Sequence, residues 1–175
     1  MKYLILSLAI SLIPITIGKQ TIDTVKSGVT FEVMNMKINT VEGSFKGMKG
    51  DLQFDANDLD NSYFNATIDA STVDTDNSKR DEHLKEEDFF NVKKHKTIDF
   101  TSNAVVRSKK EGYFIAKGQL QIGEIAKEVK IPFTYQNGIF NGTLKINRLD
   151  YEIGTDYSAF LISEEVSIKI QCVTE

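Results

Sequence analysis

The segment 79–100, KRDEHLKEEDFFNVKKHKTIDF, holds both histidines of the chain and a dense mixture of acidic, basic and aromatic side chains. His83 beside Asp81 or Glu82 has the composition of an acid/base site, because an imidazole near a carboxylate exchanges protons around neutral pH. The sequence offers no nucleophile elbow, phosphate-binding loop or cofactor motif to accompany it. An acid/base enzyme is therefore one alternative, and no cofactor is expected.

A metal site is a second alternative for the same segment. His83 and His95 are twelve residues apart and fall in different predicted elements. Cys172, the single cysteine, excludes both a multi-cysteine zinc site and an intramolecular disulfide. Mixed carboxylate sites remain open, but the expectation is that no metal ion is bound.

A structural role is the preferred interpretation of this segment. Ser78 and Asp81 match a helix-capping box, which predicts a short helix from about Lys79 to Glu87. Apolar side chains of the segment are expected to fold back onto the rest of the domain, while charged ones pair with neighbouring backbone and charges. The predicted structural motif consists of Arg80, Asp81, His83, Leu84, Phe89 and Phe90, with no catalytic residue among them.

The elements that must position this segment are β-strands. From residue 29 onward, apolar and polar residues alternate with period two, as in YFIAKGQLQI at 113–122. Such runs predict antiparallel strands with one face dry and one face wet. Asn137–Gly138 predicts a two-residue hairpin turn. About eight strands with one short helical insertion predict an all-β barrel or sandwich. We favour an eight-stranded antiparallel barrel, because full closure removes exposed edges.

Several residues on the apolar face are small, which favours a hollow barrel that holds one hydrocarbon-like ligand. The alternative, that small residues relieve crowding at bends, stays open. The predicted lining of the tunnel is Phe31, Val33, Phe54, Phe64, Ala66, Ile68, Phe100, Ala116, Gly118, Leu120, Phe133, Gly142, Leu144 and Ile168.

The first eighteen residues resemble a secretory signal peptide. Lys2 precedes an apolar run from Leu4 to Ile17 that is shorter than the roughly 20 residues of a membrane-spanning helix. An uncleaved anchor is the alternative. We expect cleavage after Gly18, export to the periplasm or outside the cell, and a single domain over residues 19–175.

The charge balance bears on the partners. The formal net charge is −4, and it becomes −5 when Lys2, the sole charged residue of 1–18, is removed. Charges of both signs are interspersed, which argues against nucleic acid as a partner.

Five segments carry a resemblance to a known family. They are VTFEV at 29–33, GSFKGMKGDLQFD at 43–55, IDASTVDTDNSKRDEHLKEEDFFNV at 68–92, GQLQIGEIAKEVKIPF at 118–133 and INRLDYEIG at 146–154. With these segments the chain resembles the YceI-like, or polyisoprenoid-binding, family over its whole mature length. The resemblance implies an exported, lipocalin-like barrel whose tunnel takes a long isoprenoid or other lipid. Glu152 stands where glycine is common in that family.

Three functions follow from these observations. The leading one is a binding protein for a long-chain isoprenoid or similar lipid, without catalysis and without a stable membrane span. The second is an enzyme that acts on a lipid-like amide or ester through His83. The third is a filled, structural or stress-response barrel. A homodimer is a further arrangement left open.

Overall fold

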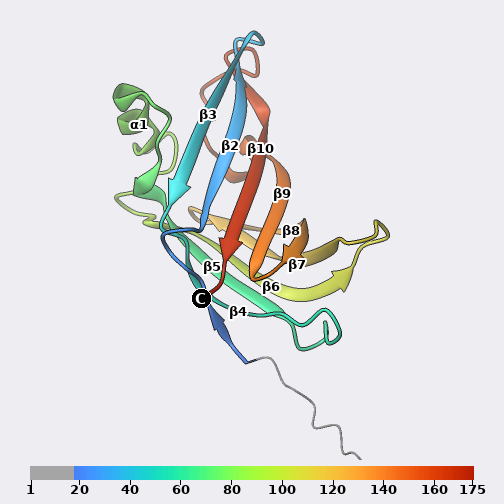
Figure 1. Ribbon diagram of the computed structural model, residues 1–175. Helices are drawn as coiled ribbons and strands as arrows, with labels where there is room; N and C mark the ends of the chain where they lie inside the picture. Colours follow the sequence, from blue (N-terminus) through green and yellow to red (C-terminus); the bar gives the residue numbers. More distant parts are fainter. Residues whose placement is uncertain (1–17) are drawn as a thin grey trace, which may run out of the picture.

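The computed structural model describes residues 18–175, so the predicted signal segment lies almost wholly outside the described residues. Within this range the chain forms ten strands, one α-helix and two 3-10 helices (Figure 1). The strands are β1 Gln20–Thr21, β2 Gly28–Asn35, β3 Asn39–Lys46, β4 Lys49–Gln53, β5 Tyr63–Asp69, β6 Thr97–Arg107, β7 Phe114–Ile122, β8 Ile125–Gln136, β9 Ile139–Asn147 and β10 Ile162–Val173. The helices are η1 Ala70–Thr72, α1 Ser78–Leu84 and η2 Arg148–Tyr151.

All ten strands belong to one antiparallel sheet with the order β1-β4-β5-β6-β7-β8-β9-β10-β2-β3. In Figure 1, β2, β3, β9 and β10 form one wall, and β4 to β8 curve round beneath it. The predicted all-β antiparallel fold with one short helix is confirmed. The predicted closed eight-stranded barrel is wrong, because the sheet is an open half-barrel that ends at β1 and β3.

The segment that follows β5 covers the open side of the sheet. Ser44 of β3 exchanges two backbone hydrogen bonds with Asp74, at 2.8 and 3.0 Å between N and O. Phe45, also on β3, meets Phe90 edge to face with ring centroids 5.3 Å apart. Helix α1 lies outside the sheet beside β3 (Figure 1). Edge strand β3 is thus shielded by η1, α1 and the turns after α1, which serves the same purpose as closure.

Helix α1 begins one residue earlier than the sequence predicts and ends sooner. Asn77 is the N-cap, and its side-chain oxygen accepts a hydrogen bond from Arg80 N at 3.1 Å. The predicted capping box at Ser78 is therefore wrong, because Asp81 is turned toward Thr75 instead. After Leu84 the chain continues in turns, in which Phe90 N donates to Leu84 O at 3.0 Å.

An aromatic cluster fills one end of the half-barrel, near the β8–β9 hairpin. Phe54, which follows β4, is 2% exposed. Its ring lies 5.0 Å from that of Phe114 and 5.4 Å from that of Phe140, both nearly perpendicular to it. Edge-to-face contacts of this kind add stability beyond the burial of their area. The end of the sheet is thus plugged by packed rings.

Candidate ligand-binding cavity

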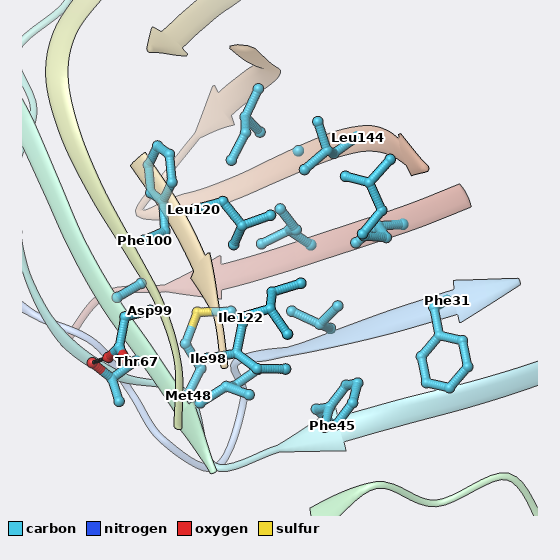
Figure 2. A pocket seen from close by; sticks show the side chains of 18 of the residues that line it. Phe31, Phe45, Met48, Thr67, Ile98, Asp99, Phe100, Leu120, Ile122 and Leu144 are labelled. Atoms are coloured by element: carbon cyan, nitrogen blue, oxygen red, sulfur yellow. Dashed lines mark hydrogen bonds between the residues drawn. The ribbon is translucent and has the colours of Figure 1, made fainter. Parts of the chain in front are cut away.

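The two halves of the sheet enclose a cavity of about 240 Å³. Figure 2 shows side chains such as Phe31, Phe100, Leu120 and Leu144 pointing into a shared space from different strands. A cavity of ~150 Å³ with apolar walls already admits benzene. The interior is therefore large enough to receive a sizeable apolar group, and the walls are hydrocarbon almost throughout.

Most of the predicted lining residues face this cavity. They do so because period-two alternation fixes which side chains of a strand share a face. The twelve that line it are Phe31, Val33, Phe64, Ala66, Ile68, Phe100, Ala116, Leu120, Phe133, Gly142, Leu144 and Ile168. Other lining residues were not singled out from the sequence, although several occupy the same alternating positions: Phe45, Met48, Ile98, Ile122, Ile131, Phe140, Ile146, Val166 and Ile170.

Two predicted lining residues do not border the cavity. Phe54 belongs to the aromatic plug described above. A Cβ atom added at Gly118 would lie 2.2 Å from the carbonyl oxygen of Thr101 and 2.6 Å from the Cα of Ser102. At this place β6 carries a bulge opposite β7. Gly118 therefore permits a close approach of two backbones at a bend, and it does not leave room for a ligand.

Thr67 and Asp99, which border the cavity, turn their polar groups away from it. Thr67 Oγ1 donates to one carboxylate oxygen of Asp99 at 2.6 Å, and Thr97 Oγ1 donates to the other at 2.7 Å. In Figure 2 this pair lies apart from the apolar side chains that converge on the cavity. The carboxylate is already hydrogen-bonded at both oxygens, so it offers little to a guest.

Arg148, at the start of η2, is the buried charge beside the cavity, with 2% of its surface exposed. Burial lowers the pKa of its guanidinium, and the charge of Glu164 opposes this shift. Its five N–H groups make five hydrogen bonds of 2.5 to 3.1 Å to backbone carbonyl oxygens. The acceptors are Ile153, Gly154, Tyr157, Ile162 and Ser163.

A guanidinium has five donors, so Arg148 has none left for an anionic head group. Its role is to hold the chain between η2 and β10 in one conformation. At Glu152 in this segment φ is +54°, a conformation that glycine adopts with less strain. No sequence signal singles out Arg148, because all of its acceptors are backbone atoms.

Two residues of the predicted structural motif, Arg80 and Asp81, bind Thr75, which was not among the predicted residues and which is 5% exposed. Asp81 accepts hydrogen bonds from both the backbone N and the Oγ1 of Thr75. Arg80 donates from Nε to Thr75 Oγ1 at 2.8 Å and from an η nitrogen to Thr75 O at 2.7 Å. These contacts tie α1 to the strand-like segment beside β3.

Replacing Asp81 with alanine is expected to lower the free energy of unfolding by about 1–3 kcal/mol, because two buried donors of Thr75 lose their acceptor. Thermal and denaturant unfolding measure the effect. Glu82→Ala is the matched control, since Glu82 is exposed and bonds Lys85 Nζ at 2.9 Å; it should change stability by less than about 0.5 kcal/mol. An Asp81→Ala protein as stable as the control would contradict the anchoring role.

His83 does not pair with Asp81 or Glu82, contrary to the acid/base alternative drawn from the sequence. Its Nε2 lies 2.9 Å from Asp88 Oδ2 and 3.3 Å from Tyr157 OH. Desolvation, followed by the charge of Asp88, raises the pKa of the Tyr157 phenol, which therefore stays protonated. The ring of His83 also meets that of Phe89 edge to face at 5.0 Å. Asp88 and Tyr157 connect the α1 segment to the loop that Arg148 holds.

The other side chains that could react or bind a metal lie apart from His83 and from one another. His95 lies 3.8 Å from Glu124, away from His83. Cys172 faces the cavity, and burial raises the pKa of its thiol to about 12, so the nucleophilic thiolate is scarce at neutral pH. Within residues 18–175, no group of three or more His, Cys, Asp or Glu side chains is placed to hold a metal ion. No helix in the described part of the chain is long and apolar enough to cross a bilayer.

The fold and the site define an antiparallel half-barrel around an apolar cavity. The family profile of the YceI-like domain matches residues 20–174, and the chain belongs to this family. It is 28% identical over 157 residues to a UPF0312 protein of Ectopseudomonas mendocina, covering 84% of this chain and 82% of that one.

Solved structures agree with this assignment. The crystal structure of Burkholderia cenocepacia BcnA matches with a TM-score of 0.82 and 26% identity, over 88% of this chain and 99% of that one. A polyisoprenoid binding domain from Saccharophagus degradans, implicated in plant cell wall breakdown, matches with a TM-score of 0.70 over 89% and 97% of the two chains. At 12% identity, this second match shows a shared fold alone.

Proposed function

We propose that this protein binds a long-chain isoprenoid-type lipid in the cavity, as an exported carrier or store that catalyses no reaction. The observation that carries the proposal is an unfilled interior whose walls are almost entirely hydrocarbon. Burying each methylene of a guest contributes roughly 0.8 kcal/mol. Affinity should therefore rise with chain length until the cavity is full. The polyisoprenoid binding domain from Saccharophagus degradans adds support, because it has the same fold.

The arrangement of polar groups indicates how such a lipid would lie. The five donors of Arg148 are all used by backbone carbonyls, and both oxygens of Asp99 are hydrogen-bonded. A polar head group inside the cavity would lose its bonds to water without replacement. We infer that the hydrocarbon chain enters and the head group stays in water at the mouth of the cavity.

The absence of catalysis is part of the proposal. The polar and titratable groups on the cavity wall include the protonated thiol of Cys172, the guanidinium of Arg148, whose five donors are all used, and the carboxylate of Asp99, which accepts hydrogen bonds from two threonines. None of them is poised to attack or deprotonate an apolar guest. His83 belongs to a partly exposed cluster outside the cavity lining. Purified protein should not hydrolyse lipid esters or amides, and the His83→Ala variant should give the same result.

Native mass spectrometry of protein taken from the exported fraction of its own host tests the proposal. The expected result is a chain that begins near Lys19 and carries an apolar molecule, which organic extraction releases. The mass of the chain tests the signal segment, and the mass of the guest tests the ligand class. Protein that is retained in the cytoplasm with residues 1–18 attached would contradict export. A guest that is small and polar would contradict the lipid assignment.

A further inference from the structure

A patch of exposed apolar side chains lies at one end of the molecule. It comprises three residues of the β2–β3 hairpin and two of the loop before β10, and we call it the apolar tip: Met34, Met36, Ile38, Phe160 and Leu161. Ile38 is 83% exposed and Phe160 57%. The backbone joins the two parts, since Met36 N donates to Leu161 O at 3.0 Å. Figure 1 shows the hairpin and the loop side by side. Exposed apolar side chains gathered on neighbouring segments are typical of an interaction site.

The turn of this hairpin has large residues at two positions where the backbone conformation favours asparagine or glycine. Met36 and Lys37 have φ of +51° and +56°, and Ile38 N donates to Asn35 O at 3.1 Å. Asparagine and glycine adopt this left-handed conformation most readily, and the β8–β9 hairpin of the same chain uses Asn137–Gly138. Strained backbone that supports an exposed methionine points to a use for that side chain in solvent.

The two segments of the apolar tip carry little charge themselves, although Glu42 and Glu164 lie just beyond them. The formal net charge of the protein is −4, yet Lys37 is the sole charged residue of 34–41, and 157–163 carries none. Apolar side chains with a neighbouring lysine suit a bilayer that contains anionic lipids. A twofold contact between two copies through the tip would instead bring Lys37 toward its equivalent.

The apolar tip lies next to the cavity wall along the chain. Val33 and Ile162 line the cavity, and they directly precede Met34 and follow Leu161 in the chain. We propose that the apolar tip docks on the surface of an anionic bilayer and brings this end of the cavity to the lipid. The passage of lipid between bilayer and cavity rests on the proposed function, whereas docking itself does not.

Co-sedimentation with vesicles of phosphatidylethanolamine and phosphatidylglycerol tests docking. The full mature chain should bind, and added salt should weaken binding by screening Lys37. Ile38→Ser with Phe160→Ser should weaken it at least about tenfold, because two inserted side chains are lost. Val25→Ser is the matched control; Val25 is 92% exposed but lies outside the tip, and its replacement should leave binding unchanged.

A second variant separates docking from folding. Met36→Asn with Lys37→Gly installs the turn residues that the backbone prefers, so the thermal midpoint should stay or rise while vesicle binding falls. Cargo-free protein and the cavity variant Ala66→Phe should still dock, which distinguishes this proposal from lipid binding. Vesicle binding that survives both tip variants would overturn the proposal. So would a tip-dependent dimer in sedimentation velocity without vesicle binding, which would assign the tip to a second copy.

Discussion

Arg148→Met should lower the free energy of unfolding by about 3–5 kcal/mol, because five carbonyl oxygens lose their donors in a buried place. For a domain of this size, a loss of that order moves the thermal midpoint down by about 10 °C. The loop between η2 and β10 should also exchange its amide hydrogens faster, since Arg148 holds three carbonyls of this loop and the first two carbonyls of β10. Calorimetry and hydrogen exchange measure the two effects.

Two further variants test whether the lost hydrogen bonds of Arg148 cause the fall in the free energy of unfolding. Arg148→Lys keeps the charge but offers three donors for five acceptors, so its stability should lie between those of the wild type and the methionine variant. Arg107→Met is the matched control, because Arg107 is exposed and donates to one carbonyl, that of Ala56; its effect should be below about 1 kcal/mol. Equal stability of Arg148→Met and Arg107→Met would refute the anchoring role.

Ala66→Phe should abolish most lipid uptake while leaving the ligand-free protein as stable as before. Ala66 lies on β5 with its side chain toward the cavity. A phenyl ring there occupies space that the lipid chain needs, so affinity for a long-chain isoprenoid alcohol should fall at least about tenfold. In a filled barrel the same change would overpack the interior and cost about 1–3 kcal/mol. Fluorescence displacement measures uptake, and thermal unfolding measures stability.

The matched control for this variant is Ala126→Phe. Ala126 lies on β8 and is exposed, so the same chemical change occurs on the wet face of the sheet. Its uptake of lipid should equal that of the wild type. The filled barrel would be favoured by two results together: neither the wild type nor Ala66→Phe takes up lipid, and Ala66→Phe has a lower thermal midpoint. Gly118 does not suit this test, because a side chain there would meet the backbone of β6.

The alternation of apolar and polar residues determined which side chains face inward. Alternation is a local property: once a segment is extended, successive side chains point to opposite faces, whatever the sheet does farther away. Phe31, Leu120 and Leu144 come from three different strands, and their position on the cavity wall followed from this rule alone. The Asn137–Gly138 turn was predictable for the same reason, since its backbone preference lies within two residues.

Properties that depend on distant segments were decided by the tertiary structure. Alternation is the same in an open sheet and a closed one, so it could not show that the sheet ends at β1 and β3 with residues 70–92 across the gap. Gly118 looked like a source of empty space, but the bulge in β6 fills that place with backbone. His83 found its partners in Asp88 and Tyr157, and Tyr157 is 74 residues away in the chain.

Arg148 shows the physical limit most clearly. Its five acceptors are carbonyl groups, which every residue possesses, so no pattern of side-chain types marks them. They become a binding site for a guanidinium only when residues 153–163 fold back around η2. The sequence by itself thus determined most of the strands, most of their inward faces and the hydrocarbon character of the cavity. The tertiary structure alone decided the opening of the barrel, the partners of its polar groups and the exposure of the apolar tip, because each depends on contacts between segments far apart in the chain.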